Sequence, residues 1–408
     1  MSQSHSVRLE TGTADGAHRG PALLAYPFRP FFILAGLYAV IVVFGWLGLL
    51  FAGWPVGEGM SPLRWHAHEL VFGLTSAAIA GFLLTAMCQW TGAKPLRGTG
   101  LALLVALWIA GRVAMWSGGV LPGVVIAVID VAFLVAFGAI AARVIIGAGS
   151  RRNLVLLGVL ALLVAGNIAS HIGMRGDQST LAVGAEHASI MLVLLLIVII
   201  AGRITPAFTG NWLAQQGRDR RVVRGDARLD LAAIVATAAV IPAAWVTTLP
   251  WLMPAVALLA AALNAARLIG WSGWHAARNP LLWVLHVGYA WVVVTLVLRG
   301  LEPWSAAITP TVWLHAAGVG AIGTMLLGVM TRVALGHTGR PLVLPRGASI
   351  IYGLISAAAL LRLGAAFDWL DYRWSLLGAG FAWILAFALF LAWFAPILAS
   401  PRPDGRPG

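Results

Sequence analysis

The chain is a succession of long apolar segments separated by short polar stretches. Most segments are about 20 residues long, which is the length an α-helix needs to cross the hydrocarbon core of a bilayer. The segments run approximately over residues 31–53, 66–90, 99–117, 121–145, 153–173, 181–203, 229–249, 254–272, 281–300, 309–334, 348–367 and 374–398. The pattern predicts an all-α fold, a polytopic membrane bundle of about 12 transmembrane helices.

The polar stretches divide the chain into a single transmembrane domain and two tails. The domain covers residues 29–400, between a polar tail at 1–28 and a short one at 401–408. We expect the first tail to be mostly disordered, and it lacks the apolar core of a cleaved signal peptide. The longest connection, the basic loop 204–228, would separate two halves of six spans each.

Composition and charge agree with this organisation. Hydrophobic residues make up 60% of the chain and charged residues 10%, whereas a soluble domain averages about 25% charged. With alternating spans, 21 of the Lys and Arg residues fall on the side of the two termini and four on the other side. Because basic loops stay in the cytoplasm, both termini are predicted there. The net charge of +13 is therefore explained by topology, and we expect no nucleic-acid partner.

Polar residues inside the spans gather at one depth. This topology puts five histidines in the outer half of the membrane, which are His66, His68, His171, His187 and His315. Six other polar residues share that half, which are Glu69, Arg112, Asp130, Asn167, Glu186 and Arg362. Ionisable groups in hydrocarbon are costly and by default mark function. A lone membrane histidine is more often a hydrogen-bond partner between helices, so it is the group as a whole that favours ligation.

The residue types indicate which ligands such a site would take. The one cysteine, Cys88, excludes disulfides, Cys-based metal sites and covalent c-type haem within one chain. Imidazoles suit haem iron, copper and zinc. Buried Arg112 and Arg362 would suit carboxylates such as haem propionates, although Arg112 and Asp130 are equally explained as a structural ion pair. His286 and His337 form a second tier near the cytoplasmic side.

The sharpest local motif is Trp65-His-Ala-His-Glu69. Residues two apart on a helix project about 200° apart, so His66 and His68 are expected to face two different centres. Glu69 lies three residues after His66 and would share its face, where its carboxylate could orient that imidazole. Glu186, beside His187, would do the same only for a neighbouring helix.

Motifs along nearly the whole chain resemble the NnrS family. They are Tyr26-Pro-Phe-Arg-Pro-Phe-Phe32, Trp65-His-Ala-His-Glu-Leu70, Ile79-Ala-Gly-Phe-Leu-Leu-Thr85, Trp90-Thr-Gly92, Arg203-Ile-Thr-Pro-Ala-Phe-Thr209, Asn211-Trp212, Leu285-His-Val-Gly-Tyr-Ala-Trp291, Gly320-Ala-Ile-Gly-Thr-Met325, Met330-Thr-Arg332 and Gly336-His-Thr-Gly-Arg-Pro341. The resemblance implies a twelve-span inner-membrane protein with haem and copper, linked to denitrification and to nitric oxide resistance.

The chain is also similar, more distantly, to the catalytic subunit of haem–copper oxidases and nitric oxide reductases. We leave open whether the two are related. Span number and metal centres near the outer face are similar. However, this chain has no His-His pair and no His-x-x-x-Tyr motif, and its His-x-His element lies in the second span rather than the tenth. The ligand scheme of those enzymes therefore does not transfer directly.

The leading hypothesis is a haem–copper membrane protein that binds, detoxifies or reduces nitric oxide. His66 or His68 would ligate a non-covalent b-type haem with His315 as the other axial candidate, and His171 and His187 would hold copper or a second haem. Asp130, Glu186 and Glu69 are the candidates for proton relay, and a quinol or a cytochrome would donate electrons. The alternatives are a two-half secondary transporter and a non-catalytic metal scaffold or sensor in the nitric oxide response.

Overall fold

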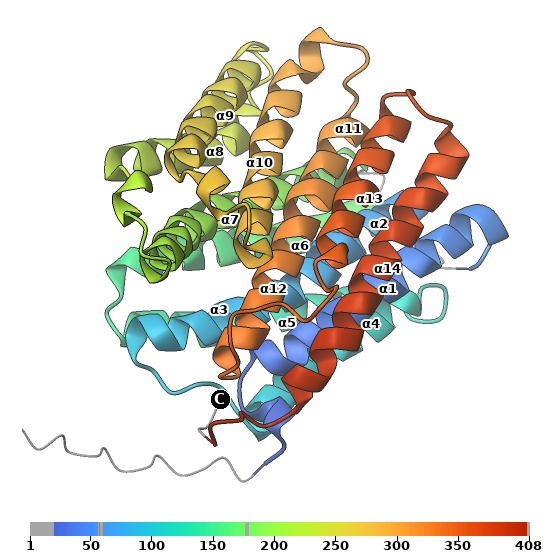
Figure 1. Ribbon diagram of the computed structural model, residues 1–408. Helices are drawn as coiled ribbons and strands as arrows, with labels where there is room; N and C mark the ends of the chain where they lie inside the picture. The colour runs from blue at the N-terminus through green and yellow to red at the C-terminus, as the bar shows by residue number, and fades with distance from the viewer. Residues whose placement is uncertain (1–19, 56, 58–59, 176–178, 406–408) are drawn as a thin grey trace, which may run out of the picture.

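The computed structural model describes residues 20–405 apart from 56, 58–59 and 176–178. These residues form helices and connecting loops, and none of the described segments is a strand (Figure 1). Most of the tail predicted to be disordered, residues 1–19, lies outside the described residues, as do residues 406–408. The rest of the first tail is ordered, with a short helical turn η1 at Ala22–Leu24.

Each of the twelve apolar segments coincides with one helix or with one continuous helical run. In chain order the main helices are α1 (Phe28–Ala52), α2 (Pro62–His68), η2 (Glu69–Thr75), α3 (Ser76–Thr91), α4 (Thr99–Trp116), α5 (Gly123–Gly147), α6 (Leu154–Arg175), α7 (Ser179–Gln215), α8 (Ala227–Ala243), α9 (Leu252–Gly270), α10 (Pro280–Leu301), α11 (Pro310–His315), η7 (Ala316–Gly323), α12 (Thr324–His337), α13 (Ile350–Ala366) and α14 (Tyr372–Ala399). Short helical turns lie in the loops, which are η3 (Arg151–Asn153), η4 (Arg220–Val222), η5 (Gly273–Ala276) and η6 (Glu302–Trp304).

Ten of these runs, counted over the described residues, are long and apolar enough to cross a membrane. The other two, α8 and α13, have 17 residues each. The chain is therefore a multi-pass membrane protein, and the predicted all-α polytopic bundle is confirmed.

One predicted boundary is wrong. Helix α7 continues through Pro206 to Gln215 and so takes up the first half of the predicted loop 204–228. Its last turns are buried, since Thr205, Thr209 and Leu213 are each 0% exposed. Burial against neighbouring helices stabilises a helix more than local propensity does, so polar and proline residues in this stretch do not end it.

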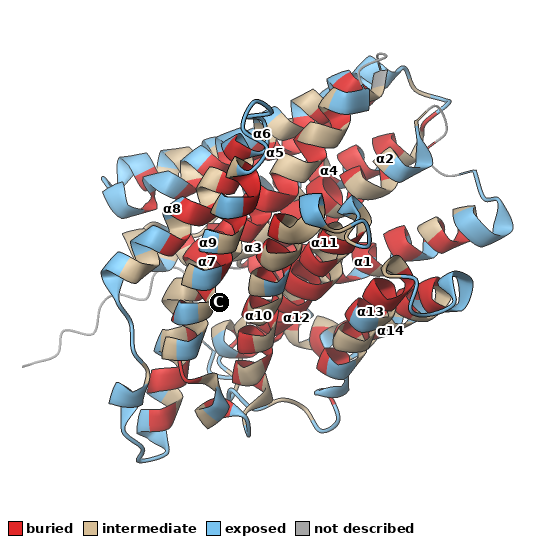
Figure 2. Cartoon of the chain, turned by 90° about the horizontal axis from the view of Figure 1, so that it is seen from above, coloured by how far each residue is buried: buried red, intermediate tan, exposed pale blue. Residues whose placement is uncertain are grey.

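The helices form an inner group surrounded by an outer group. The run from α2 to α3, helices α7 and α10, and the run from α11 to α12 are mostly buried, whereas less than half is buried in the other six of the ten long spans. Figure 2 shows buried residues along the middle of the bundle and exposed ones at its edge. Large apolar side chains such as Leu103, Val128 and Leu360 point outward, as expected where the surrounding solvent is lipid.

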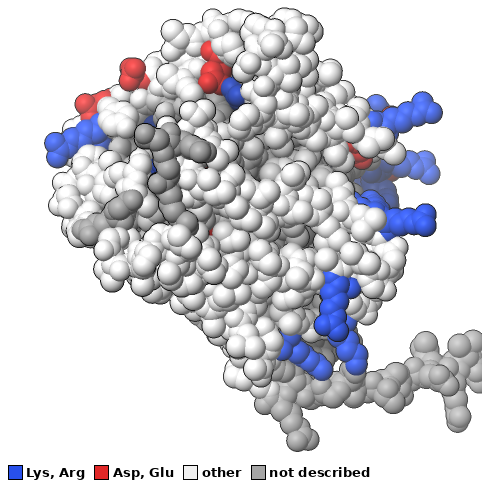
Figure 3. Space-filling view, turned by 180° about the vertical axis from the view of Figure 1, so that it is seen from behind, with Lys and Arg blue, Asp and Glu red and all other residues white. Residues whose placement is uncertain are grey.

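The charged side chains on the surface are also unevenly distributed. In Figure 3, most of the Lys and Arg side chains in view stand along one edge of the molecule, and the broad surface beside them is largely uncharged. An uncharged belt next to a basic rim is the surface expected of a protein that spans a bilayer.

The first and last spans, α1 and α14, lie side by side (Figure 1). Arg29, at the start of α1, is fully buried there. Its Nη1 atom donates to the carbonyl oxygens of Leu398 and Ser400, each at 2.7 Å. The last carbonyls of a helix have no partner within the helix, so Arg29 caps the C-terminal end of α14.

Replacing this cap should destabilise the bundle. The substitution Arg29→Met keeps the apolar stem and removes the donors, and hydrogen bonds from a charged group contribute about 1.5–3 kcal/mol each. We expect a lower midpoint of thermal unfolding in detergent for this variant. The exposed Arg97 provides a control, Arg97→Met, which should unfold at the wild-type temperature; equal midpoints for both variants would contradict the capping role.

Candidate functional site

Two short helices that carry candidate ligands end in the same unusual way. Helix α2 ends at His68 and passes directly into the π-helix η2, and α11 ends at His315 and passes directly into the π-helix η7. A π-helix has one more residue per hydrogen-bonded turn, and such segments are frequently found at functional sites. Each therefore shifts the register of its helix immediately after a histidine.

A cavity of about 330 Å³, here called the histidine cavity, lies between these two helices and α1, α7, α13 and α14. Its volume is within the range of small-molecule sites, about 300–1,000 Å³. Its wall is mainly apolar. The polar side chains that line it are Arg64, His66, Thr75, Glu186, His187, Thr311, His315 and Arg362.

Two imidazoles reach this cavity from α2 and α11. His66 stacks on the Trp46 ring with 4.2 Å between ring centroids, and its Nδ1 atom is buried with no hydrogen-bond partner among the described residues. The Nδ1 atom of His315 lies 2.7 Å from the carbonyl oxygen of Thr311. That bond fixes the ring and leaves Nε2 as the free nitrogen, which is the usual preparation of a metal-binding histidine.

Charged groups complete the wall. The Nη1 atom of Arg362 is buried without a hydrogen-bond partner in the described part of the chain. Arg64 and Glu186 form an ion pair on another part of the wall, and Ser170 donates to Glu186 at 3.5 Å. His187 packs edge-on against Trp313, with ring centroids 5.1 Å apart. The cavity thus combines apolar walls with imidazoles and one guanidinium that has spare donors.

The second histidine of the motif belongs to a different group, here called the polar network. Its members are Tyr38, His68, Glu69, Arg112, Asp130, Asn167 and His171, all of them buried. Arg112 forms ion pairs with both Glu69 and Asp130, and Tyr38 donates to Glu69. Gly73 makes room for this arrangement, because a Cβ atom there would lie 2.6 Å from the Nη1 atom of Arg112.

Three ligand atoms of the polar network converge. The Nε2 atom of His171 is 2.9 Å from Oδ2 of Asp130, and the Nε2 atom of His68 is 3.3 Å from the same oxygen. These atoms all lie within 4.8 Å of one another, on three different helices, so they could hold a metal ion. Asn167 lies beside them, with Oδ1 at 2.9 Å from His68 and Nδ2 donating to Asp130 at 2.9 Å.

The other atoms of these ligands are already bound. His68 Nδ1 is 3.1 Å from Glu69 Oε1, and Asp130 Oδ1 accepts from Arg112. A carboxylate on the far nitrogen of a ligating histidine fixes its tautomer and is typical of metal sites. The atoms that converge are therefore the Nε2 atoms of His68 and His171 and the Oδ2 atom of Asp130.

Comparison with known proteins agrees with the motifs. A family model described as NnrS protein matches residues 22–402, nearly the whole chain. The chain belongs to the NnrS family. A search of curated proteins finds no match. In this NnrS family member the matched region includes both cavity-lining histidine helices and the whole polar network.

The predicted site residues separate into two groups. His66 and His68 point into different environments, as their spacing indicates. His187, His315 and Arg362 share the histidine cavity with His66, whereas His171 and Asp130 share the polar network with His68. The second-tier residues lie in neither site: His286 contacts Thr209 at 3.0 Å, and His337 packs on Phe28.

Two predicted roles are wrong. Glu69 was expected to orient His66, but its carboxylate contacts His68, Tyr38 and Arg112. A buried charge without a partner is strongly destabilising, and Glu69 is paired with the guanidinium of Arg112. For the same reason Arg112 is not available as a propionate partner, and the alternative ion pair with Asp130 is the arrangement observed.

Sequence reasoning missed Tyr38 and Trp46 as site residues, together with both π-helices. A tyrosine inside an apolar span is a signal that could have indicated Tyr38, since its hydroxyl needs a partner. The Arg64–Glu186 ion pair was also missed, because Arg64 was counted as a loop charge. Hydropathy gives no sign of which helices will be neighbours, so these contacts required the structure.

Removing Arg112 should be more damaging than removing the whole charge cluster. Arg112→Met leaves Glu69 and Asp130 as buried unpaired carboxylates, and breaking a buried ion pair in this way costs about 3–5 kcal/mol. We expect a large loss of thermal stability and of monodisperse protein. The triple variant Glu69→Gln, Asp130→Asn, Arg112→Met removes all three charges and should recover most of the stability. A triple variant as unstable as the single one would contradict this electrostatic account.

Proposed function

We propose that this protein is a haem- and copper-containing protein of the bacterial inner membrane that binds nitric oxide and removes it by reduction. Membership of the NnrS family supports a nitric oxide-related membrane protein. The observation that carries the proposal is the meeting of His66, His315 and Arg362 on one cavity of about 330 Å³.

The residues of the histidine cavity fit a haem. His66 has a buried nitrogen without a partner among the described residues, and His315 has one nitrogen fixed by Thr311 and one left over. Either imidazole or both would hold the haem iron, and the Nη1 donor of Arg362 would bind a propionate carboxylate. When bound, haem iron supplies a site for nitric oxide and a path for electrons.

The residues of the polar network fit a copper ion. His68, His171 and Asp130 present two imidazole nitrogens and one carboxylate oxygen, a donor set that suits copper. Glu69 holds the other ring nitrogen of His68, and Arg112 holds the other carboxylate oxygen of Asp130.

The remaining groups would serve the reaction around these sites. Reduction of two molecules of nitric oxide takes two electrons and two protons and gives nitrous oxide and water. Glu186 lies in the wall of the histidine cavity and Glu69 and Asp130 lie in the polar network, so they are the candidates to hold and pass protons. The electrons would come from a quinol or an external cytochrome. Both chain termini would lie in the cytoplasm.

An optical spectrum of the purified protein tests the haem assignment. We expect a Soret band in the wild type, and loss or displacement of that band in His315→Ala because a residue that would hold the iron is removed. His275→Ala provides the control, since His275 lies in the loop turn η5 and should leave the spectrum unchanged. A wild-type protein without any Soret band would overturn the proposal.

Product analysis tests the reduction. Under anaerobic conditions with a chemical reductant, the protein should convert added nitric oxide to nitrous oxide over many turnovers. Asp130→Asn should slow this conversion, because it removes a proton-holding group from the network. Tight binding of nitric oxide with no nitrous oxide would contradict reduction and favour the scaffold alternative.

A further inference from the structure

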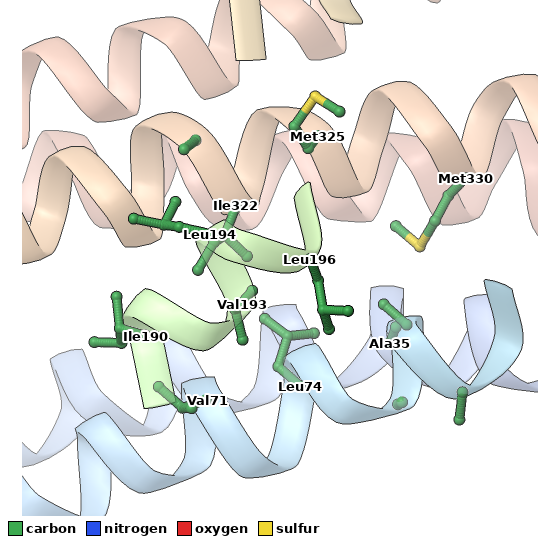
Figure 4. Packing of buried hydrophobic residues seen from close by; sticks show 14 of the residues in the cluster. Ala35, Val71, Leu74, Ile190, Val193, Leu194, Leu196, Ile322, Met325 and Met330 are labelled. Atoms are coloured by element: carbon green, nitrogen blue, oxygen red, sulfur yellow. The ribbon is translucent and has the colours of Figure 1, made fainter. Parts of the chain in front are cut away.

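A second cavity lies between α3, α7 and α12. Its volume is about 80 Å³, and we call it the apolar cavity. Ala78 and Phe82 line it from α3, Val193 and Leu196 from α7, and Met325 and Met330 from α12. Figure 4 shows Val193 and Leu196 lying between the segment that carries Leu74 and the one that carries Ile322, Met325 and Met330.

The side chains that line the apolar cavity offer water at most one hydrogen-bond partner. The one hydroxyl in its wall belongs to Thr75, and this group donates to the carbonyl oxygen of Leu70 at 2.7 Å. A buried water needs about two to four polar partners, whereas apolar cavities stay dry and take up uncharged ligands such as xenon. The cavity therefore suits a small uncharged molecule.

The apolar cavity adjoins the histidine cavity. Thr75 and Ile322 line both of them. Thr75 is the last residue of η2, and Ile322 lies within η7, so each π-helix contributes one residue to the boundary. Both side chains are at most 6% exposed, and together they form the wall between the two spaces.

The far side of the apolar cavity reaches the surface of the bundle. Several of its lining residues, Phe82, Ile197, Ile200 and Val329, are only half-buried. Nitric oxide and other uncharged diatomic gases dissolve better in hydrocarbon than in water, and this surface faces lipid. By contrast, the histidine cavity has the Arg64–Glu186 ion pair in its wall, with 19% of the Arg64 side chain exposed.

We propose that the apolar cavity is a binding site for an uncharged diatomic gas, which enters it from the lipid and passes between Thr75 and Ile322 into the histidine cavity. This inference rests on the proposed function, because it names the route by which that site receives its ligand. Gas binding itself requires no metal.

Xenon locates the site directly. Crystals of the wild-type protein under xenon pressure should show a xenon atom among Ala78, Val193 and Met325. Ala78→Leu fills the space and should abolish this peak, while Ala106→Leu, at an exposed position of α4, should keep it. An acyl chain in the cavity, or no xenon in the wild type, would overturn the proposal.

Ligand rebinding tests the route. After flash photolysis of carbon monoxide from the reduced protein, Ala78→Leu should rebind several-fold more slowly than Ala106→Leu, and Phe82→Ala should rebind faster because it widens the opening. Loss of the xenon peak with an unchanged rebinding rate would contradict the route. A protein that binds xenon but has no Soret band would contradict the proposed function and leave the gas site standing.

Discussion

Arg112 lies between two carboxylates in the hydrocarbon part of the bundle, where none of the three has water as an alternative partner. Buried charged side chains are tolerated only when each of them is paired with a group of opposite charge. The pairing draws Glu69 away from His66 and toward His68, and it occupies one oxygen of Asp130, so that the other faces His68 and His171. The convergence of three ligand atoms is thus a consequence of where one guanidinium is held.

The two π-helices shape the histidine cavity. Because η2 and η7 begin directly after His68 and His315, the helices change register between the candidate ligands and the apolar segments that follow. Their residues then line both the histidine cavity and the apolar cavity. A polar ligand set at one end and an apolar space at the other are therefore consequences of the same two helix distortions.

Much of the fold could be predicted from the sequence, because a lipid-spanning helix has an obligatory length and apolarity. The divergence of His66 and His68 also followed from helix geometry alone. The predictions that were wrong concern contacts between helices. Glu69 pairs with Arg112, which lies on another helix, and α7 continues further than predicted because Thr205 and Leu213 are packed in the interior. The division of five histidines into two sites was likewise beyond the sequence, since depth in the membrane does not say which helices touch.

The central claim is that one helix, α2, supplies two separate centres from residues two apart. Metal and haem content of His66→Ala and His68→Ala, measured side by side on purified protein, tests it most directly. The account predicts that His66→Ala alters the haem spectrum and keeps the copper, whereas His68→Ala loses the copper and keeps the haem spectrum. Loss of both cofactors in each variant, or of the same one in both, would contradict it.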